Sequence, residues 1–319
     1  MTGWIVQTLA ASTLLMLAVM ALRPFLRCHV APGLVYALWL FPALRLAMPS
    51  LPFLPAGSVA APEAVGLPLG GEVATAAVPT AAILVAVWLA GAALHLGWQL
   101  FLYARFVAVA RAGVVGIPRR VGAVHILHST GVEGPVALGI WRRTVFLPAD
   151  FGVQFDAEER RLAIAHELTH HRRHDVLANL AATTVLSLHW FNPLAHLAYR
   201  LFREDQELAC DADVIAAEGG AQRHAYGRIL VKASSEAPTA LCTLSDVAFL
   251  KMRLGGLGRA TPASGRLATW IVGGLAASGL VLSAAAPAAL PRLQASAPPA
   301  AASAVQEVRT AARPPVPAL

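Results

Sequence analysis

The chain has 319 residues, of which 57% are hydrophobic and only 13% are charged. Soluble domains are roughly one-quarter charged and about half apolar, so this composition indicates a membrane protein and argues against a wholly soluble one. Arginine supplies almost all of the excess positive charge, which amounts to a formal net charge of +7 at pH 7. Three cysteines, Cys28, Cys210 and Cys242, are too few and too scattered for a disulfide scaffold.

Residues 1–105 contain three apolar runs, each close to the roughly 20 residues that a helix needs to cross a bilayer. The runs cover about 4–22, 31–48 and 80–103. No positive charge precedes the first run, whereas Arg23 and Arg27 follow it in what we expect to be a short loop. A secretory signal peptide has the opposite arrangement, so we predict a retained helix with its N-terminus outside. In the third run we expect His95 and Gln99, one turn apart, to form helix-to-helix hydrogen bonds rather than a polar site within the membrane.

The segment 106–266 differs from its flanks in charge. Between Arg111 and Arg266 it carries 18 of the 25 Lys and Arg residues, and the positive-inside bias places such a segment in the cytoplasm. A further apolar run at 267–283 predicts a fourth membrane helix. The tail at 284–319 is rich in Ala and Pro, cannot bury a core, and is expected to be disordered and extracytoplasmic. We therefore predict a multi-pass protein of the inner (plasma) membrane.

Three short stretches early in the cytoplasmic segment alternate between apolar and polar residues. They cover 123–128, 134–140 and 143–148, and predict a small β-sheet beside a helix. An edge strand of such a sheet can pair with an extended peptide, but the sequence does not identify which strand does so here. His125 and His128 stand three positions apart, which puts them on opposite faces of a strand, so we expect residues of the sheet faces rather than metal ligands.

A helical segment follows and contains the motif HELTH, which begins at His166. Asp156 and Glu159 form a capping-box pattern at the start of this helix. Positions i and i+4 share one helix face, so His166 and His170 can offer two imidazole nitrogens to a single ion. Glu167 can reach a water bound to that ion, which suits a general base. A bare motif of this kind also occurs as two exposed histidines, so a third ligand is needed to support a zinc site.

The next segment, 176–202, is apolar enough by hydropathy to suggest another membrane helix. Several polar residues interrupt it, Pro193 breaks it midway, and charged residues flank both ends. A crossing would also put the histidine pair and everything after residue 202 on opposite sides of the bilayer. We therefore expect this segment to pack against the histidine-bearing helix, and partly against lipid.

A third ligand candidate lies on the helix that follows. Glu207 stands 37 positions after the second histidine and is followed four residues later by Asp211. This pattern supplies the third zinc ligand and a supporting carboxylate, which accepts the N–H of a ligating histidine, in HExxH enzymes of the glutamate-ligand type. The alternative is a charged surface helix. We expect Cys210 to pack in the core, and His171 and His174 to be solvated or paired with acids.

These residues together resemble the membrane metallopeptidases of the BlaR/MecR type, which are β-lactam-responsive antirepressor receptors. The resemblance rests on about 50 contiguous residues and on the layout of membrane runs around the polar segment. Its motifs are the run from His166 to Asp175, then Asn179, Trp190 to Pro193, Arg203, Asp205, Glu207 and Ala209 to Asp211.

The resemblance implies a gluzincin-like zinc metallopeptidase domain with one Zn²⁺ bound by His166, His170 and Glu207. Glu167 would be the catalytic base, and Asp175 and Asp211 would support the ligands. It also implies an endopeptidase that acts in signal transduction on itself or on a cytoplasmic protein, in characterised members a DNA-binding repressor. Those receptors end in a folded penicillin-binding sensor domain, whereas only about 35 residues follow the last apolar run here. β-Lactam sensing is therefore not expected.

The predicted architecture is an α+β membrane protein with about four transmembrane helices. Its mostly helical metallopeptidase domain carries a small β-sheet and is inserted between the third and fourth helices. A non-catalytic membrane sensor or scaffold that keeps the zinc-protease fold stays open as an alternative. An intramembrane protease is disfavoured because charged residues flank the HELTH motif. Direct nucleic-acid binding is not expected, since 15 acidic residues offset the basic ones in the polar segment.

Overall fold

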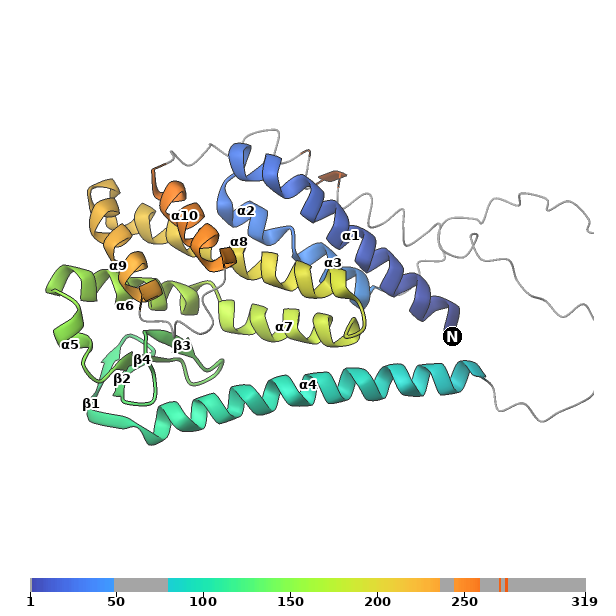
Figure 1. Ribbon diagram of the computed structural model, residues 1–319, viewed down its shortest axis with the longest axis horizontal. Coiled ribbons are helices and arrows are strands. Elements are labelled where there is room, and N and C mark those ends of the chain that lie inside the picture. The colour runs from blue at the N-terminus through green and yellow to red at the C-terminus, as the bar shows by residue number, and fades with distance from the viewer. Residues whose placement is uncertain (1, 49–79, 236–243, 259–269, 271–272, 275–319) are drawn as a thin grey trace, which may run out of the picture.

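The computed structural model describes residues 2–48, 80–235, 244–258, 270 and 273–274, which form a mainly helical protein with one four-stranded sheet (Figure 1). The sheet lies at one end of the molecule, and the long N-terminal helix extends away from that end. The expected α+β class, mostly helical with a small sheet, is confirmed.

Two helices are long and apolar enough to cross a membrane, α1 (Thr2–His29) and α4 (Thr80–Ala112). The second expected membrane run instead forms two shorter helices, α2 (Pro32–Ala37) and α3 (Leu40–Ala47). Within the described residues, two of the four expected membrane helices therefore meet this criterion of length and composition. The fourth, at 267–283, and the tail at 284–319 fall almost wholly outside those residues.

Both candidate membrane helices are longer than the apolar runs that predict them. α1 continues through Arg23, Pro24 and Arg27, so the prediction of a loop at the two arginines is wrong. Their charges do not end the helix because both guanidinium groups pair with Asp205 of a distant helix. α4 continues to Ala112 and so passes the expected domain boundary at residue 106.

The sheet consists of β1 (Val114–Val121), β2 (Val124–Ser129), β3 (Val136–Leu138) and β4 (Thr144–Pro148), in the order β1-β2-β4-β3. β2 and β4 are parallel, and the other two pairs are antiparallel. The three expected strands are confirmed, and β1 is additional. β1 escapes prediction because Gly116 and Pro118 interrupt it and its register shifts between Val115 and Arg119.

Six further helices complete the described fold. They are α5 (Phe151–Gln154), α6 (Ala157–Arg172), α7 (Asp175–Leu188), α8 (Pro193–Glu218), α9 (Arg223–Ser235) and α10 (Leu244–Leu257). The capping box of α6 is confirmed, because Asp156 Oδ1 accepts from the Glu159 N–H at 2.8 Å and Glu159 Oε2 accepts from the Asp156 N–H at 3.2 Å. The expected break at Pro193 is also confirmed, since this residue begins α8.

α7 lies between α4 and α8 and contacts both (Figure 1). Gly91 of α4 allows a close approach here, because a Cβ on it would lie 2.4 Å from Cε2 of Trp190. His95 Nδ1 is 2.9 Å from Ser187 Oγ on α7, which is the expected helix-to-helix hydrogen bond. The apolar segment also packs against α6 as expected, since α6 contacts both α7 and α8.

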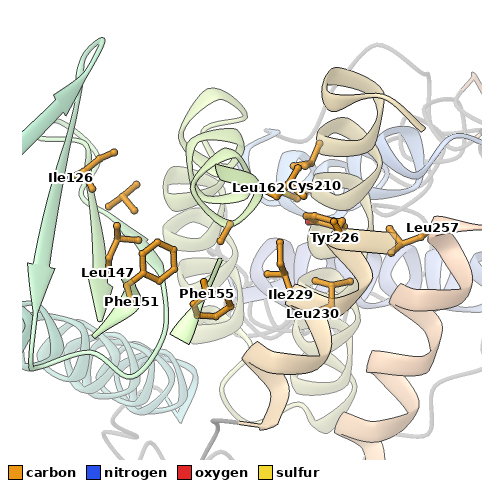
Figure 2. Close-up of a cluster of buried hydrophobic side chains, with 14 of the residues drawn as sticks. Ile126, Leu147, Phe151, Phe155, Leu162, Cys210, Tyr226, Ile229, Leu230 and Leu257 are labelled. Atoms are coloured by element: carbon orange, nitrogen blue, oxygen red, sulfur yellow. The ribbon is translucent and has the colours of Figure 1, made fainter. Parts of the chain in front are cut away.

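Buried side chains form two main apolar clusters that meet different parts of α8. The first joins the sheet to α6, α8, α9 and α10, and includes Leu147, Leu162 and Tyr226 (Figure 2). The second joins α1 and α2 to α7 and α8, and includes Val19 and Phe202. α8 therefore connects the N-terminal helices to the part of the fold that carries the HELTH motif.

Candidate metal centre

Side chains from two helices converge beside the sheet. His166 and His170 stand one turn apart on α6, and Glu207 comes from the middle of α8. The two histidine Nε2 atoms are 3.2 Å apart, and the Glu207 carboxylate oxygens lie 3.4 Å from His166 Nε2 and 3.8 Å from His170 Nε2. Donor atoms bound to one tetrahedral Zn²⁺ at about 2.0–2.2 Å are about 3.3–3.6 Å from one another. The separations therefore fit a single ion.

Each imidazole forms a hydrogen bond through Nδ1, the nitrogen that points away from the centre. This bond determines which of the two ring nitrogens carries the proton. His170 Nδ1–H donates to Asp175 Oδ2 at 2.7 Å, which leaves the lone pair on Nε2. His166 Nδ1–H donates to Tyr226 Oη at 2.7 Å, and that hydroxyl donates to Asp211 Oδ1 at 2.7 Å. Two lone pairs that face each other beside a carboxylate repel unless a cation lies between them. This donor set therefore fits a divalent metal ion.

Asp211 supports the first histidine through an intermediate group rather than directly. Its Oδ1 is 3.7 Å from His166 Nδ1, and the Tyr226 hydroxyl bridges the two. Burial and the Asp211 charge raise the pKa of Tyr226 well above its usual value, so the hydroxyl keeps its proton. Arg253 of α10 donates to both Asp211 oxygens, at 2.7 and 2.8 Å, and fixes the carboxylate.

The charges around the centre favour an ionised third ligand. Burial alone would raise the pKa of Glu207, but the adjacent His166 ring, when it is charged, and the charge of Arg253, whose Nη2 lies 3.4 Å away, hold it well below its usual range. Burial alone would lower the pKa of His170, whereas its bond to Asp175 and the charge of Glu207 raise it. A second proton on His170 would occupy Nε2, the atom that a metal ion would bind, so proton and metal ion compete for this residue.

The centre opens into a cavity of about 410 Å³. Glu167 lines this cavity together with the three candidate ligands, and only 8% of its surface is exposed. Val136 and Ala137 of β3 also line the cavity, and β3 is an edge strand of the sheet. Asn179 is a further lining residue, and its Oδ1 is buried without a hydrogen-bond partner in the described structure. The cavity thus brings a carboxylate, an unpaired amide oxygen and a strand edge to the same place.

Cys210 offers a second way to complete a metal site. Its Sγ is 3.5 Å from His166 Nδ1, so the two motif histidines and this thiol form a compact group. The thiol faces the ring edge that is already bonded to Tyr226, whereas Glu207 faces the Nε2 edges. Burial and the charge of Glu207 also raise the pKa of the Cys210 thiol far above its ordinary value, and a protonated thiol is a poor ligand. We therefore favour Glu207 as the third ligand.

The other histidines near the motif have structural roles. His171, expected to be solvated or paired with an acid, is buried and donates from Nε2 to the Thr144 carbonyl at 3.1 Å, so that prediction is wrong. His174 is exposed and begins α7 in the left-handed region at φ 59°. His128 Nδ1 lies 3.2 Å from the Pro148 carbonyl within the sheet. None of the three joins the two motif histidines.

Tyr226 and Arg253 belong to this candidate site and were missed by sequence reasoning. Each contacts Asp211 from a later helix, α9 or α10. Neither stands at a fixed spacing from the HELTH motif, so no local pattern marks them. Their one distinguishing feature in the sequence is chemical. Each is a polar side chain, a hydroxyl or a guanidinium, on a helix that also contributes to the apolar core.

Comparisons with known proteins identify a family. The family model described as BlaR1 peptidase M56 matches residues 4–254. The regulatory protein BlaR1 of Bacillus licheniformis is 29% identical over 112 residues, which cover 35% of this chain and 18% of that protein. The methicillin resistance mecR1 proteins of Staphylococcus aureus and Staphylococcus epidermidis are each 25% identical over 111 residues, which cover 35% of this chain and 19% of theirs. The chain thus spans less than a fifth of the length of these curated relatives.

The fold and the site define a metallopeptidase-type protein with two helices that are apolar enough to cross a membrane. Because the family model covers most of the sequence, the chain belongs to the BlaR1 peptidase M56 family.

Proposed function

We propose that the chain is a membrane-embedded zinc-dependent endopeptidase. In this proposal His166, His170 and Glu207 bind one Zn²⁺, and Glu167 is the catalytic base. The observation that carries the proposal is that both Nε2 atoms and the Glu207 carboxylate lie within 3.2–3.8 Å of one another, in a cavity that Glu167 also lines.

The proposed chemistry is hydrolysis of a peptide bond by an activated water. When bound, Zn²⁺ lowers the pKa of water to about 7 and polarises a peptide carbonyl. Glu167 accepts the proton of the attacking water and returns it to the leaving amine. Asp175 and Tyr226 keep the ligand rings oriented, because each is hydrogen bonded to the Nδ1 edge of one histidine.

We further propose that the substrate binds as an extended peptide along β3. This strand is at the edge of the sheet, and its first two residues line the cavity, so its free backbone groups can pair with a substrate strand. β3 spans only three residues, so it offers pairing over roughly 10 Å. Asn179 also lines the cavity, and its Oδ1, which is buried and unpaired in the described structure, could accept a hydrogen bond from the substrate backbone.

The proposed target is a cytoplasmic protein, such as a DNA-binding repressor, or the chain itself, in signal transduction. This rests on the resemblance of the motif-bearing segment to antirepressor receptors and on the family match. The proposed setting is the inner membrane, with 106–266 in the cytoplasm and the N-terminus outside, which rests on the arginine distribution.

The decisive variant is Glu167→Gln, because it removes the base and leaves the three candidate ligands in place. We expect the purified variant to retain about one zinc per chain by elemental analysis and to lose proteolysis. In cells, comparison of the proteome with and without the variant should reveal one protein, or this chain, whose cleavage disappears. Retained cleavage in Glu167→Gln would refute the assignment of the base. Zinc binding with identical proteomes would instead support a non-catalytic sensor or scaffold.

A further inference from the structure

A tyrosine of the N-terminal helices reaches the candidate metal centre. Tyr36 lies near the end of α2, which packs against α8. Its hydroxyl donates to Asp175 Oδ1 at 3.1 Å and accepts from Gln206 Nε2 at 2.9 Å. The other oxygen of Asp175, Oδ2, accepts from His170 Nδ1 at 2.7 Å. A continuous chain of hydrogen bonds therefore runs from α2 to one of the candidate zinc ligands.

The middle of this chain is buried, although Asp175 also lines the cavity at the candidate centre. Asp175 is 1% exposed and Gln206 is fully buried. In such surroundings a hydrogen bond is strong, and a buried acceptor that loses its donor cannot recover one from solvent. Asp175 Oδ1 therefore depends on the Tyr36 hydroxyl, while Oδ2 holds the histidine.

Packing holds the tyrosine ring in the orientation that this chain requires. The ring lies 5.4 Å from the ring of Phe202 on α8, and the Arg173 guanidinium lies 5.1 Å from its centroid. Three residues further along, Trp39 Nε1 donates to Asp205 Oδ2 at 2.8 Å. α2 and the residues that directly follow it therefore contact Asp205 and Gln206, the two residues that precede Glu207 on α8.

We propose that Tyr36 is a positioning residue of the metal centre: through Asp175 it fixes the orientation of His170. The proposal rests on the proposed function, because it assumes that His170 binds zinc. The second apolar run of the sequence, 31–48, forms α2 and α3 instead of one membrane helix. The proposal gives α2 a specific role, because α2 supplies a polar group to the site.

Tyr36→Phe tests the assignment, because it keeps the ring and removes only the hydroxyl. The measurement is zinc affinity of the full chain in detergent, by competition with a chromophoric chelator. Loss of an outer partner of a metal ligand weakens metal binding by roughly 10–100-fold, and we expect about tenfold for this more distant group. Tyr199→Phe is the matched control, since that ring also lies near Phe202 and its hydroxyl is 3.3 Å from Thr183 Oγ1, away from the centre.

A double variant separates an effect through Asp175 from a general loss of packing. In the Asp175→Ala background, Tyr36→Phe should weaken zinc binding by no more than about twofold further, because the route to His170 is already broken. Unchanged affinity in Tyr36→Phe, or a full tenfold loss in the Asp175→Ala background, overturns the assignment of Tyr36. A wild-type chain that binds no zinc overturns the metal centre itself, and this result is distinct from the other two.

Discussion

The two candidate histidine ligands are supported by chemically different partners. His170 donates to the carboxylate of Asp175, whereas His166 donates to the neutral hydroxyl of Tyr226. A carboxylate partner increases the basicity of an imidazole more than a hydroxyl does, so the two rings are not equivalent as ligands. The Asp211 carboxylate is hydrogen bonded to that hydroxyl and lies 3.7 Å from the ring nitrogen of His166.

Removal of the bridging hydroxyl should weaken the metal site without unfolding the chain. In Tyr226→Phe, His166 Nδ1 loses its acceptor, while Arg253 still holds Asp211. We expect a roughly tenfold loss of zinc affinity, measured by chelator competition. Tyr103→Phe, whose hydroxyl accepts only from the Gly139 N–H at 3.2 Å, serves as control. Equal zinc affinity in wild type and Tyr226→Phe would contradict this role.

A residue of the candidate site can be predicted from the sequence only where it belongs to a local pattern. The helical period brings together His166 and His170, and a fixed spacing indicates Glu207, so these residues can be found without coordinates. Tyr36 and Tyr226 reach the same centre only because α2 and α9 pack against other helices. No spacing along the chain encodes that packing.

At the scale of elements, the first turn of α6 is fixed by more than its capping box. Glu159 is 2% exposed, accepts from the Asp156 N–H, and pairs with Lys232 and Arg228 of α9. Burial alone would raise the pKa of Glu159, but the hydrogen bonds from Lys232 and Asp156 lower it. The start of the motif helix is thereby attached to α9, which carries Tyr226.

Because of these contacts of Glu159, the stability of the fold should decrease at acid pH. A carboxyl whose pKa is lowered by folding stabilises the fold above its unfolded pKa of about 4.3, and loses that contribution as pH falls through the folded value. We expect Glu159→Gln to lower Tm at pH 7, and the difference from wild type to shrink as the pH falls below about 4. Glu158→Gln, an exposed acid in the same turn, should change Tm little at any pH. A Tm difference that is independent of pH would exclude the charge of Glu159 as the cause.

Element boundaries were less predictable than element types for identifiable reasons. β1 contains Gly116 and Pro118, which are typical of turns, and its pairing with β2 is what holds it extended. The end of α1 contains two arginines that are typical of a loop beside a membrane helix. They remain helical because Asp205, which lies 182 positions after Arg23, neutralises them.

At the scale of the whole molecule, a buried cluster of charges joins the N-terminal helix to α8. Arg23 Nε lies 2.9 Å from Asp205 Oδ2 and Arg27 Nη2 lies 2.7 Å from Asp205 Oδ1. Glu204 adds a contact of 2.5 Å with Arg23 Nη2. Asp205 is only 1% exposed, so the pairs are largely shielded from water and salt.

Breaking this cluster should be costly, because both arginines pair with the buried Asp205 and would be left with Glu204 as the one carboxylate that contacts them in the described structure. We expect Asp205→Asn to reduce the free energy of unfolding by about 3–5 kcal/mol, measured by thermal or denaturant unfolding in detergent. Asp213→Asn removes a comparable contact, with Arg173 at 2.6 Å, but that acid is 42% exposed and should matter by less than about 1 kcal/mol. Similar losses in the two variants would show that the Asp205 cluster contributes no more than a surface pair.

The contacts of α1 and α2 with α8 also bear on how the protein can be handled. A recombinant fragment truncated to 106–266 would lack Arg23, Tyr36 and Trp39, although their partners on α8 lie inside it. The partners, Asp205 and Gln206, would then be exposed to water, and they lie two and one residues before Glu207. The part of the chain that carries the candidate metal centre is therefore not a detachable module, and biochemical work should begin from the full chain solubilised in detergent.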